Sequence, residues 1–138
     1  MPERMVIADA GKDTPSALDR IEGCCRAAGL TDQDVLEVRL VAEEVLTNIA
    51  KYAFEPEMKP AVELQLSFTD AAAVLEFRDQ GKAFDPLAQP APDLDIPWER
   101  RPLGGLGLTL VRALVDEARY VREGAANVLH LVKRRSAP

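Results

Sequence analysis

The segment VELQLSFTDAAAVLEFRD, residues 62–79, predicts two strands joined by a tight turn and indicates which side of the sheet is buried. Apolar and polar residues alternate in its first half, which is typical of a strand with one face in water. The apolar positions there are Val62, Leu64, Leu66 and Phe68. After a turn at Asp70 and Ala71, one side of the second strand carries Ala73, Leu75, Phe77 and Asp79. The pattern therefore predicts an aspartate at the end of a buried strand face.

The residues before this segment predict a strand and two helices. Residues 4–9 are typical of a short strand, and a helix is predicted from Thr14 to about Ala28, where Gly29 ends it. Residues 31–34 have the pattern of a helix cap, so a second helix is predicted over about 32–54. Its apolar face, at a spacing of 3.6 residues, consists of Val38, Val41, Ala42, Val45, Ile49, Tyr52 and Ala53.

The residues after the segment predict a long loop, a helix and two more strands. Residues 86–102 contain five prolines and almost no periodicity, so we expect a lid loop over about 86–103, with a disordered segment as the alternative. A helix follows from the glycines at 104–107 to about Val115, and strands are predicted at 118–122 and 127–133. The basic residues at 133–135 are predicted to form a solvated tail. This order predicts one α+β domain over 1–138, a two-layer sandwich with helices on one face of a mostly antiparallel sheet.

Composition excludes several classes of function. The chain has 138 residues and a net charge of −6, which argues against a general nucleic-acid binder. No apolar run approaches the roughly 20 residues of a membrane span, and the N-terminus lacks a signal-peptide core, so we expect a cytoplasmic protein without a membrane anchor. Cys24 and Cys25 are adjacent, which disfavours a disulfide, and with His130 they provide too few ligands for zinc.

Two clusters of polar residues are candidates for chemistry. Glu44, Asn48 and Lys51 lie along one edge of the second helix, where a carboxylate can act as a base and an amide oxygen can bind magnesium. Glu43 points about 100° away from this edge and is a poorer candidate, and taken alone the cluster is more simply explained as an ordinary solvated helix edge. Asp79 is predicted to be buried and to need a hydrogen-bond donor, such as the amine of a purine, while Gly81 allows a close approach to a ligand. The alternative is a polar turn at the end of a strand.

A third candidate is the glycine-rich segment that opens the last helix. Gly104, Gly105 and Gly107 expose backbone N–H groups at a helix N-terminus, which is typical of a phosphate site. The segment matches neither the dinucleotide-binding nor the P-loop pattern. A flexible hinge remains the alternative interpretation.

Taken together, the three segments resemble the N, G1 and G2 boxes of the GHKL ATPase superfamily, which has the Bergerat ATP-binding fold. The matching segments are residues 44–48, 79–85 and 104–111, in the family's order and with a lid-like loop between the last two. From the length of the sequence, we expect none of the extra domains of histidine kinases, gyrases, chaperones or mismatch-repair proteins. It resembles the RsbW-type anti-sigma factors, which are serine/threonine-protein kinases, although these often have histidine at the position of Tyr52.

The resemblance implies an ATP–Mg²⁺ site with specific roles. Asp79 would bind the adenine amine, Asn48 would bind Mg²⁺, and Glu44 would be the catalytic base. We hypothesise that Arg100 or Arg101, which precede the glycines, reaches the γ-phosphate; two exposed arginines that favour solubility are an equal explanation. The implied nucleotide-binding residues are Asn48, Lys51, Asp79, Gly81, Phe84, Arg101, Gly104, Gly105, Leu106, Gly107 and Leu108.

The implied partners are a sigma factor, which the protein would sequester, and an anti-anti-sigma (STAS-type) protein, on which it would phosphorylate a serine. The resemblance also implies a homodimer. Three other functions remain open: an ATP-binding partner-switch protein without kinase activity, a detached histidine-kinase-like ATPase module, and an α+β interaction domain that binds no nucleotide.

Overall fold

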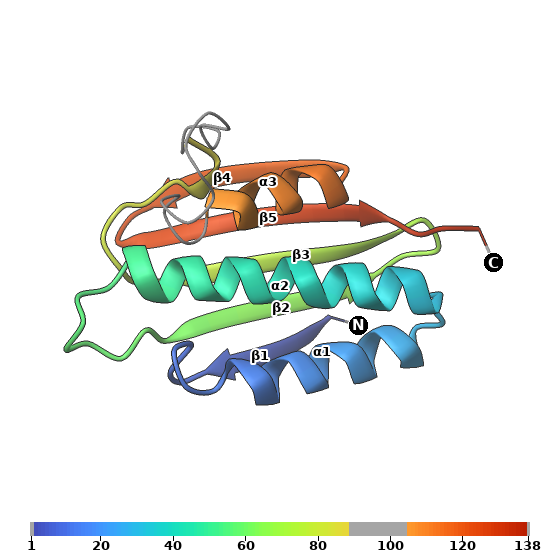
Figure 1. Cartoon of the computed structure of the whole chain (residues 1–138), viewed down its shortest axis with the longest axis horizontal. Coiled ribbons are helices and arrows are strands. Elements are labelled where there is room, and N and C mark those ends of the chain that lie inside the picture. The colour runs from blue at the N-terminus through green and yellow to red at the C-terminus, as the bar shows by residue number, and fades with distance from the viewer. Residues whose placement is uncertain (1, 89–104, 138) are drawn as a thin grey trace.

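The computed structural model describes residues 2–88 and 105–137, and it places three helices against one face of a five-stranded sheet (Figure 1). The strand order is β1-β2-β3-β5-β4, and every neighbouring pair is antiparallel. The elements are β1 (Glu3–Ile7), α1 (Thr14–Ala27), α2 (Asp32–Tyr52), β2 (Val62–Phe68), β3 (Ala72–Asp79), the short 3₁₀ helix η1 (Pro86–Ala88), α3 (Gly105–Leu114), β4 (Glu117–Glu123) and β5 (Ala126–Arg134). The predicted α+β sandwich is confirmed.

Local signals set the helix boundaries close to the predicted positions. The Thr31 hydroxyl accepts a hydrogen bond of 3.1 Å from the Asp34 N–H, which caps the start of α2. Gly29 adopts a φ of 83° after α1, a conformation that glycine adopts without steric cost. The second helix ends at Tyr52 rather than at residue 54, and β1 ends at Ile7 rather than at residue 9.

The core lies between the sheet and the inner faces of α1 and α2. The apolar faces of β2 and β3 are buried there, and Leu64, Leu66 and Phe77 are almost completely inaccessible. The predicted inner face of α2 is buried at every position except Tyr52, which is 38% exposed. That assignment was wrong because Tyr52 lies at the last turn of the helix, where its ring packs on Phe84 instead of entering the core.

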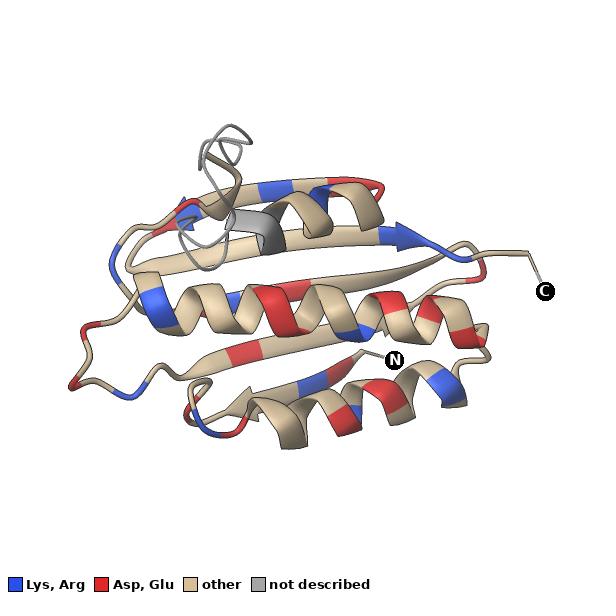
Figure 2. Cartoon of the chain, in the orientation of Figure 1, with Lys and Arg blue, Asp and Glu red and all other residues tan. Residues whose placement is uncertain are grey.

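Charged residues of both signs recur along α1 and α2 (Figure 2). Arg39 of α2 forms ion pairs with Asp19 at 3.1 Å and Glu22 at 3.7 Å, which links the two helices. All three side chains keep solvent contact, so these pairs stabilise the fold only weakly. The core therefore supplies most of the stability that holds α1 on α2.

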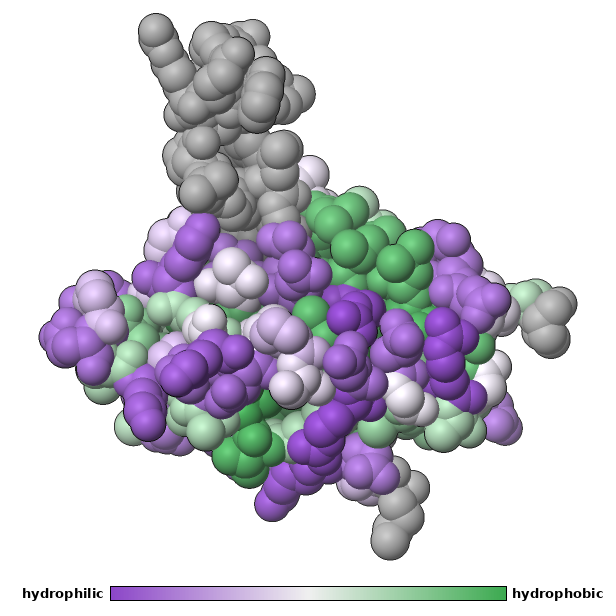
Figure 3. All heavy atoms as spheres, turned by 60° about the horizontal axis from the view of Figure 1, so that its bottom comes forward, coloured by the Kyte–Doolittle hydropathy of each residue, from purple (hydrophilic) through white to green (hydrophobic). Residues whose placement is uncertain are grey.

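Apolar surface also remains on the helical side of the molecule, where Figure 3 shows a continuous green area. Among the leucines of α2 and α3 whose burial the structure describes, Leu36, Leu40, Leu110 and Leu114 keep accessible surface. Leu36 is the most exposed of them, at 51%. No described helix is both long and apolar enough to cross a membrane.

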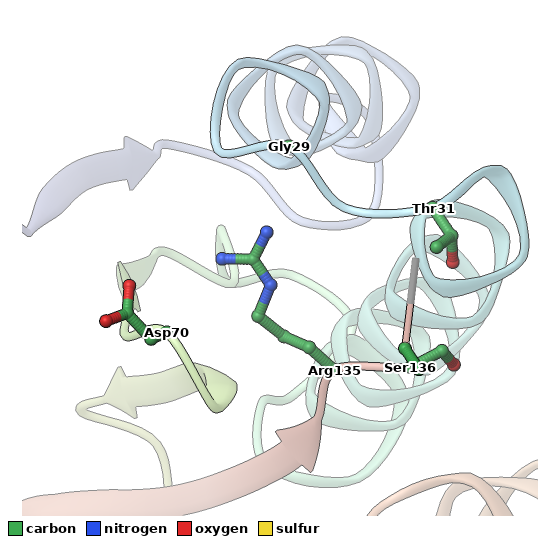
Figure 4. A pocket seen from close by; sticks show the side chains of 6 residues that line it. Gly29, Thr31, Asp70, Arg135 and Ser136 are labelled. Atoms are coloured by element: carbon green, nitrogen blue, oxygen red, sulfur yellow. The ribbon is translucent and has the colours of Figure 1, made fainter.

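Residues 133–136 form a structured clasp rather than the predicted solvated tail. Lys133 is buried and its ammonium lies 2.7 Å from a Glu37 carboxylate oxygen. Arg135 donates hydrogen bonds to the Thr69 and Ala28 carbonyls, at 3.1 and 2.8 Å, and its guanidinium extends into a pocket at this end of the molecule (Figure 4). The prediction was wrong because these partners lie far away in sequence.

The buried carboxylate of Asp34 anchors this clasp. Asp34 is 1% exposed, and its two oxygens accept hydrogen bonds from the Ser136 N–H at 2.7 Å and the Ser136 hydroxyl at 2.8 Å. Burial alone would raise the pKa of Asp34, but the bonds from Ser136, the charge of Lys133 and the bond from Thr31 together lower this pKa below its ordinary value. The clasp therefore stabilises the ionised carboxylate.

Replacing Asp34 by Asn should destabilise the fold in a pH-dependent way. The amide keeps the shape of the side chain but cannot accept both bonds from Ser136, so we expect a loss of about 1–3 kcal/mol at pH 7 in urea unfolding. Because the pKa is lowered in the folded state, this difference should shrink as the pH falls through and below 3.8, the ordinary value. Asp32→Asn, at a side chain that is 93% exposed, is the control and should cost less than about 0.5 kcal/mol. Equal stability of the two variants at pH 7 would contradict the anchoring role.

Candidate functional site

The end of α2 and the turn that follows β3 meet at one end of the molecule, and α3 begins on the same side of the molecule and packs against α2 (Figure 1). The carbonyl of Ala53, at the end of α2, accepts a hydrogen bond of 2.9 Å from the Lys82 N–H in the turn. Helices α2 and α3 pack directly against each other. The fold thus brings together the three segments that the sequence singled out.

Asp79 is buried at the end of β3, as predicted, and is 4% exposed. Its Oδ1 accepts hydrogen bonds from the Gly81 N–H at 2.9 Å and from the Asn127 amide at 3.0 Å. These two donors offset part of the cost of burying a carboxylate. Neither bond uses Oδ2, which leaves that oxygen as an acceptor for a donor such as a purine amine. Asp79 therefore both shapes the polar turn and offers a binding group.

Gly81 is required by contacts within the protein itself. A Cβ at this position would overlap the carbonyl oxygen of Ala53 and would lie 2.8 Å from the Ala53 Cβ. From the sequence alone, Gly81 is expected to allow the close approach of a ligand. In the structure, the close approach is between the turn and the end of α2.

An aromatic pair strengthens the same junction. The rings of Tyr52 and Phe84 have centroids 5.4 Å apart and are tilted by 31°. Offset aromatic pairs of this kind stabilise by about 0.5–1.5 kcal/mol beyond the area they bury. Phe84, predicted to contact nucleotide, thus has a structural partner on α2.

Asn48 is the clearest candidate for a metal ligand. Its side chain is 2% exposed, and its Nδ2 donates a hydrogen bond of 2.7 Å to the Glu44 carbonyl one turn earlier. Its Oδ1 is the only buried side-chain nitrogen or oxygen in the described part of the chain without a hydrogen-bond partner. Leaving an amide oxygen unpaired costs about 1–3 kcal/mol, and a hard cation would satisfy it.

Glu44 has the environment of a base. It is half-buried, whereas Glu43 is exposed, as the helical spacing predicts. Burial raises the pKa of Glu44, the neighbouring charge of Glu43 raises it further, and Lys51 lowers it only in part. A raised pKa makes the carboxylate a stronger proton acceptor. Lys51 itself is exposed.

The start of α3 supplies the glycine-rich element. The helix begins at Gly105, so residues 105–108 form its first turn, whose N–H groups have no partner within the helix. Helix N-termini of this kind favour anions. Arg100, Arg101 and Gly104 lie outside the described residues, as do residues 89–103 of the predicted lid and the side chains of Leu106 and Leu108.

A family model described as the histidine kinase-like ATPase domain matches residues 7–133. The chain belongs to this family. The match covers all three site segments, so the GHKL resemblance inferred from the motifs is confirmed.

Proteins of similar sequence indicate which branch of the family the chain resembles. The chain is 35% identical over 99 residues to the serine/threonine-protein kinase BtrW of Bordetella bronchiseptica. This alignment covers 72% of this chain and 69% of the relative. It is 25% identical over 114 residues to the serine-protein kinase RsbW of Listeria monocytogenes, covering 79% and 73% of the two chains. These relatives confirm the resemblance to RsbW-type proteins.

Solved structures agree on the fold. The structure of the RsbU and RsbW domains of Rv1364c from Mycobacterium tuberculosis matches with a TM-score of 0.68 at 16% identity, over 99% of this chain and 33% of the solved chain. A blue-light activated histidine kinase from Erythrobacter litoralis matches with a TM-score of 0.55 at 19% identity, over 86% of this chain and 40% of that one. This ATPase-family chain thus spans about a third of the first solved chain and two fifths of the second.

Asn127 of β5 is a residue of the candidate site that the sequence motifs do not include. Its Nδ2 donates to Asp79 Oδ1 and, at 2.8 Å, to the Lys82 carbonyl, so one amide holds both the site carboxylate and the turn. A signal was present: Asn127 has the same strand parity as Leu129 and Leu131 and therefore interrupts an apolar face. A buried polar residue on such a face needs partners.

Other reactive groups do not form a site. Cys25 is buried, and burial, followed by the neighbouring Cys24 and Glu22, raises the pKa of its thiol to about 12, which makes it unreactive at neutral pH. Within residues 2–88 and 105–137, no three His, Cys, Asp or Glu side chains are grouped to hold a metal ion.

Replacing Gly81 by Ala should damage the turn. The added methyl group meets backbone at Ala53, which cannot move as a side-chain end can, so we expect a loss of about 1–3 kcal/mol in the free energy of unfolding. The matched control is Gly23→Ala in α1, where a Cβ meets nothing within 4 Å. That variant should gain about 0.5–1 kcal/mol from helix propensity. A Gly81→Ala protein as stable as the wild type would contradict the packing argument.

Proposed function

We propose that this chain is a serine/threonine-protein kinase that binds ATP with Mg²⁺ and phosphorylates a serine of a partner protein. The observation that carries the proposal is the pair on α2: a buried, unpartnered Asn48 oxygen one turn after a half-buried Glu44 whose pKa is raised. A metal ligand beside a strengthened base is the combination that phosphoryl transfer to a hydroxyl requires. The names of the relatives support the same activity.

The nucleotide would lie across the three segments. Oδ2 of Asp79 accepts the hydrogen bond of the adenine amine at the end of the sheet. The N–H groups at Gly105 and Gly107 bind phosphate oxygens, and Arg101 from the loop reaches the γ-phosphate. Asn48 provides the protein ligand to Mg²⁺, which supplies charge neutralisation to the phosphates when bound.

Glu44 would act on the substrate hydroxyl. The carboxylate accepts the proton of the serine while the hydroxyl oxygen forms a bond to the γ-phosphorus. The bond between that phosphorus and the bridging β–γ oxygen breaks, and ADP leaves with the electron pair. The other groups of the site position the reactants and stabilise negative charge, which is most of what this reaction needs.

The proposed partners are a sigma factor and a STAS-type anti-anti-sigma protein, which the chain would bind in the cytoplasm as a homodimer. The helical side offers accessible leucines on α2 and α3, the two helices that contribute to the site (Figure 3). Phosphate on the antagonist would add negative charge against a chain whose net charge is −6. Phosphorylation would therefore weaken that complex and leave the kinase available to the sigma factor.

Glu44→Gln tests the proposal. We expect phosphorylation of the antagonist to fall about 10²–10⁴-fold, because the amide cannot accept the proton, while the dissociation constant for ATP changes little. The measurement is transfer of labelled γ-phosphate to STAS-type proteins of the same organism. A wild-type chain that binds ATP but transfers no phosphate would support a partner switch without kinase activity instead.

The control for this test is the neighbouring Glu43→Gln. Glu43 is exposed, so this variant should keep its maximal rate. It removes a negative charge that raises the pKa of Glu44, so the acid limb of its pH–rate profile should move to lower pH. An equal loss of rate in both variants would contradict the assignment of the base to Glu44.

A further inference from the structure

Three polar residues form a row across neighbouring strands at the nucleotide end of the sheet. Asp79 of β3 lies opposite Asn127 of β5, and Asn127 lies opposite Arg122 of edge strand β4. Directly opposed residues share one face of a sheet, so all three are on the side that the helices cover. The row connects the adenine-binding aspartate of the proposed function to a strand at the edge of the fold (Figure 1).

The hydrogen-bonding capacity of Asn127 is used entirely within the protein. Its Nδ2 donates two bonds, to Asp79 Oδ1 and to the Lys82 carbonyl. Its Oδ1 accepts from the Tyr120 hydroxyl, from Arg122 Nη1 at 3.1 Å and from the Phe84 N–H at 3.2 Å. An amide has two donor hydrogens and two acceptor lone pairs, so none is left for a ligand. Asn127 is 4% exposed, which agrees with an internal role.

Arg122 connects the same turn to the edge strand. Its Nη1 donates to the Gly81 carbonyl at 2.8 Å as well as to Asn127 Oδ1. The Arg122 residue is nevertheless exposed, unlike Asn127. This surface arginine on β4 therefore holds the backbone of Gly81, whose N–H donates a hydrogen bond to Asp79.

We propose that Asn127 and Arg122 are positioning residues that set the preference of the site for 6-aminopurines, an inference that rests on the proposed role of Asp79. Both donors to Asp79, the Gly81 N–H and the Asn127 amide, converge on Oδ1. They hold the carboxylate in one orientation, with Oδ2 directed away from these donors as an acceptor. Adenine presents an amine to that acceptor, whereas guanine presents a carbonyl oxygen, which an acceptor repels.

Substitutions that break the hydrogen bonds of this row should reduce the discrimination between ATP and GTP but should leave the rate of phosphoryl transfer almost unchanged. In Asn127→Leu, the carboxylate loses one of its two donors, and we expect the KM for ATP to rise by about tenfold or more. The ratio of ATP to GTP affinity should fall by a similar factor. Glu44 and Asn48 lie on α2 and keep their contacts, so kcat at saturating ATP should stay within about threefold of the wild type.

A surface variant keeps the test independent of folding. Asn127→Leu alters a buried residue, so circular dichroism and thermal unfolding must accompany it. Arg122→Ala removes an exposed side chain and should raise the KM for ATP about threefold, with kcat unchanged and the ATP-to-GTP ratio reduced. The matched control is Arg119→Ala, on the same strand but on the opposite face, paired with His130; it should leave all three quantities unchanged.

Calorimetric titrations with ATP–Mg²⁺ and GTP–Mg²⁺ separate the outcomes. If the wild type binds ATP and both Arg122→Ala and Asn127→Leu keep its affinity and its ATP-to-GTP ratio, the positioning role is overturned while the proposed kinase function stands. Equal loss of affinity for both nucleotides also overturns it, because that result indicates general damage. If the wild type binds neither nucleotide, the proposed function fails and this inference fails with it.

Discussion

The burial of Asp79 at the end of β3 is the constraint on which the proposed site depends. A carboxylate that is 4% exposed needs donors, and the protein supplies two of them at a single oxygen, from the Gly81 N–H and the Asn127 amide. The same two donors fix the turn after β3. That turn packs so closely on the end of α2 that only glycine fits at position 81. The buried Asp79 carboxylate therefore fixes the backbone of the turn and its contact with α2. It also leaves one oxygen, Oδ2, as an acceptor for a ligand.

Helix α2 joins the core to the proposed chemistry. Its inner face packs on the sheet, and Asn48 is buried as part of that face, with an oxygen that no described group satisfies. Because this face packs in the core, the position of α2 on the sheet also sets the positions of Asn48 and Glu44. At the other end of α2, the buried Asp34 receives the C-terminal clasp. The helix is thus anchored at its start by the clasp and at its end by the turn that carries Gly81.

Sequence patterns predicted what depends on local periodicity. Strand alternation predicted the burial of Asp79, and helical spacing separated the half-buried Glu44 from the exposed Glu43. The patterns failed where the partner is remote: Arg135 bonds to the Ala28 carbonyl, 107 positions away, so a basic tail was predicted where the structure has a clasp. Strand alternation marks Asn127 as a polar interruption of an apolar face, but its pairing with Asp79 follows from the register of two strands that are remote in sequence, which no local pattern contains.

The most direct test of the account is the affinity of Asp79→Asn for ATP–Mg²⁺, measured by calorimetry beside the wild type. The amide keeps the size of the side chain but can no longer offer two acceptor oxygens, one to the protein's donors and one to the adenine amine. The account predicts that binding weakens by about 100-fold, the cost of an unmet hydrogen bond to a charged group. Unchanged affinity in a variant that folds normally would contradict it.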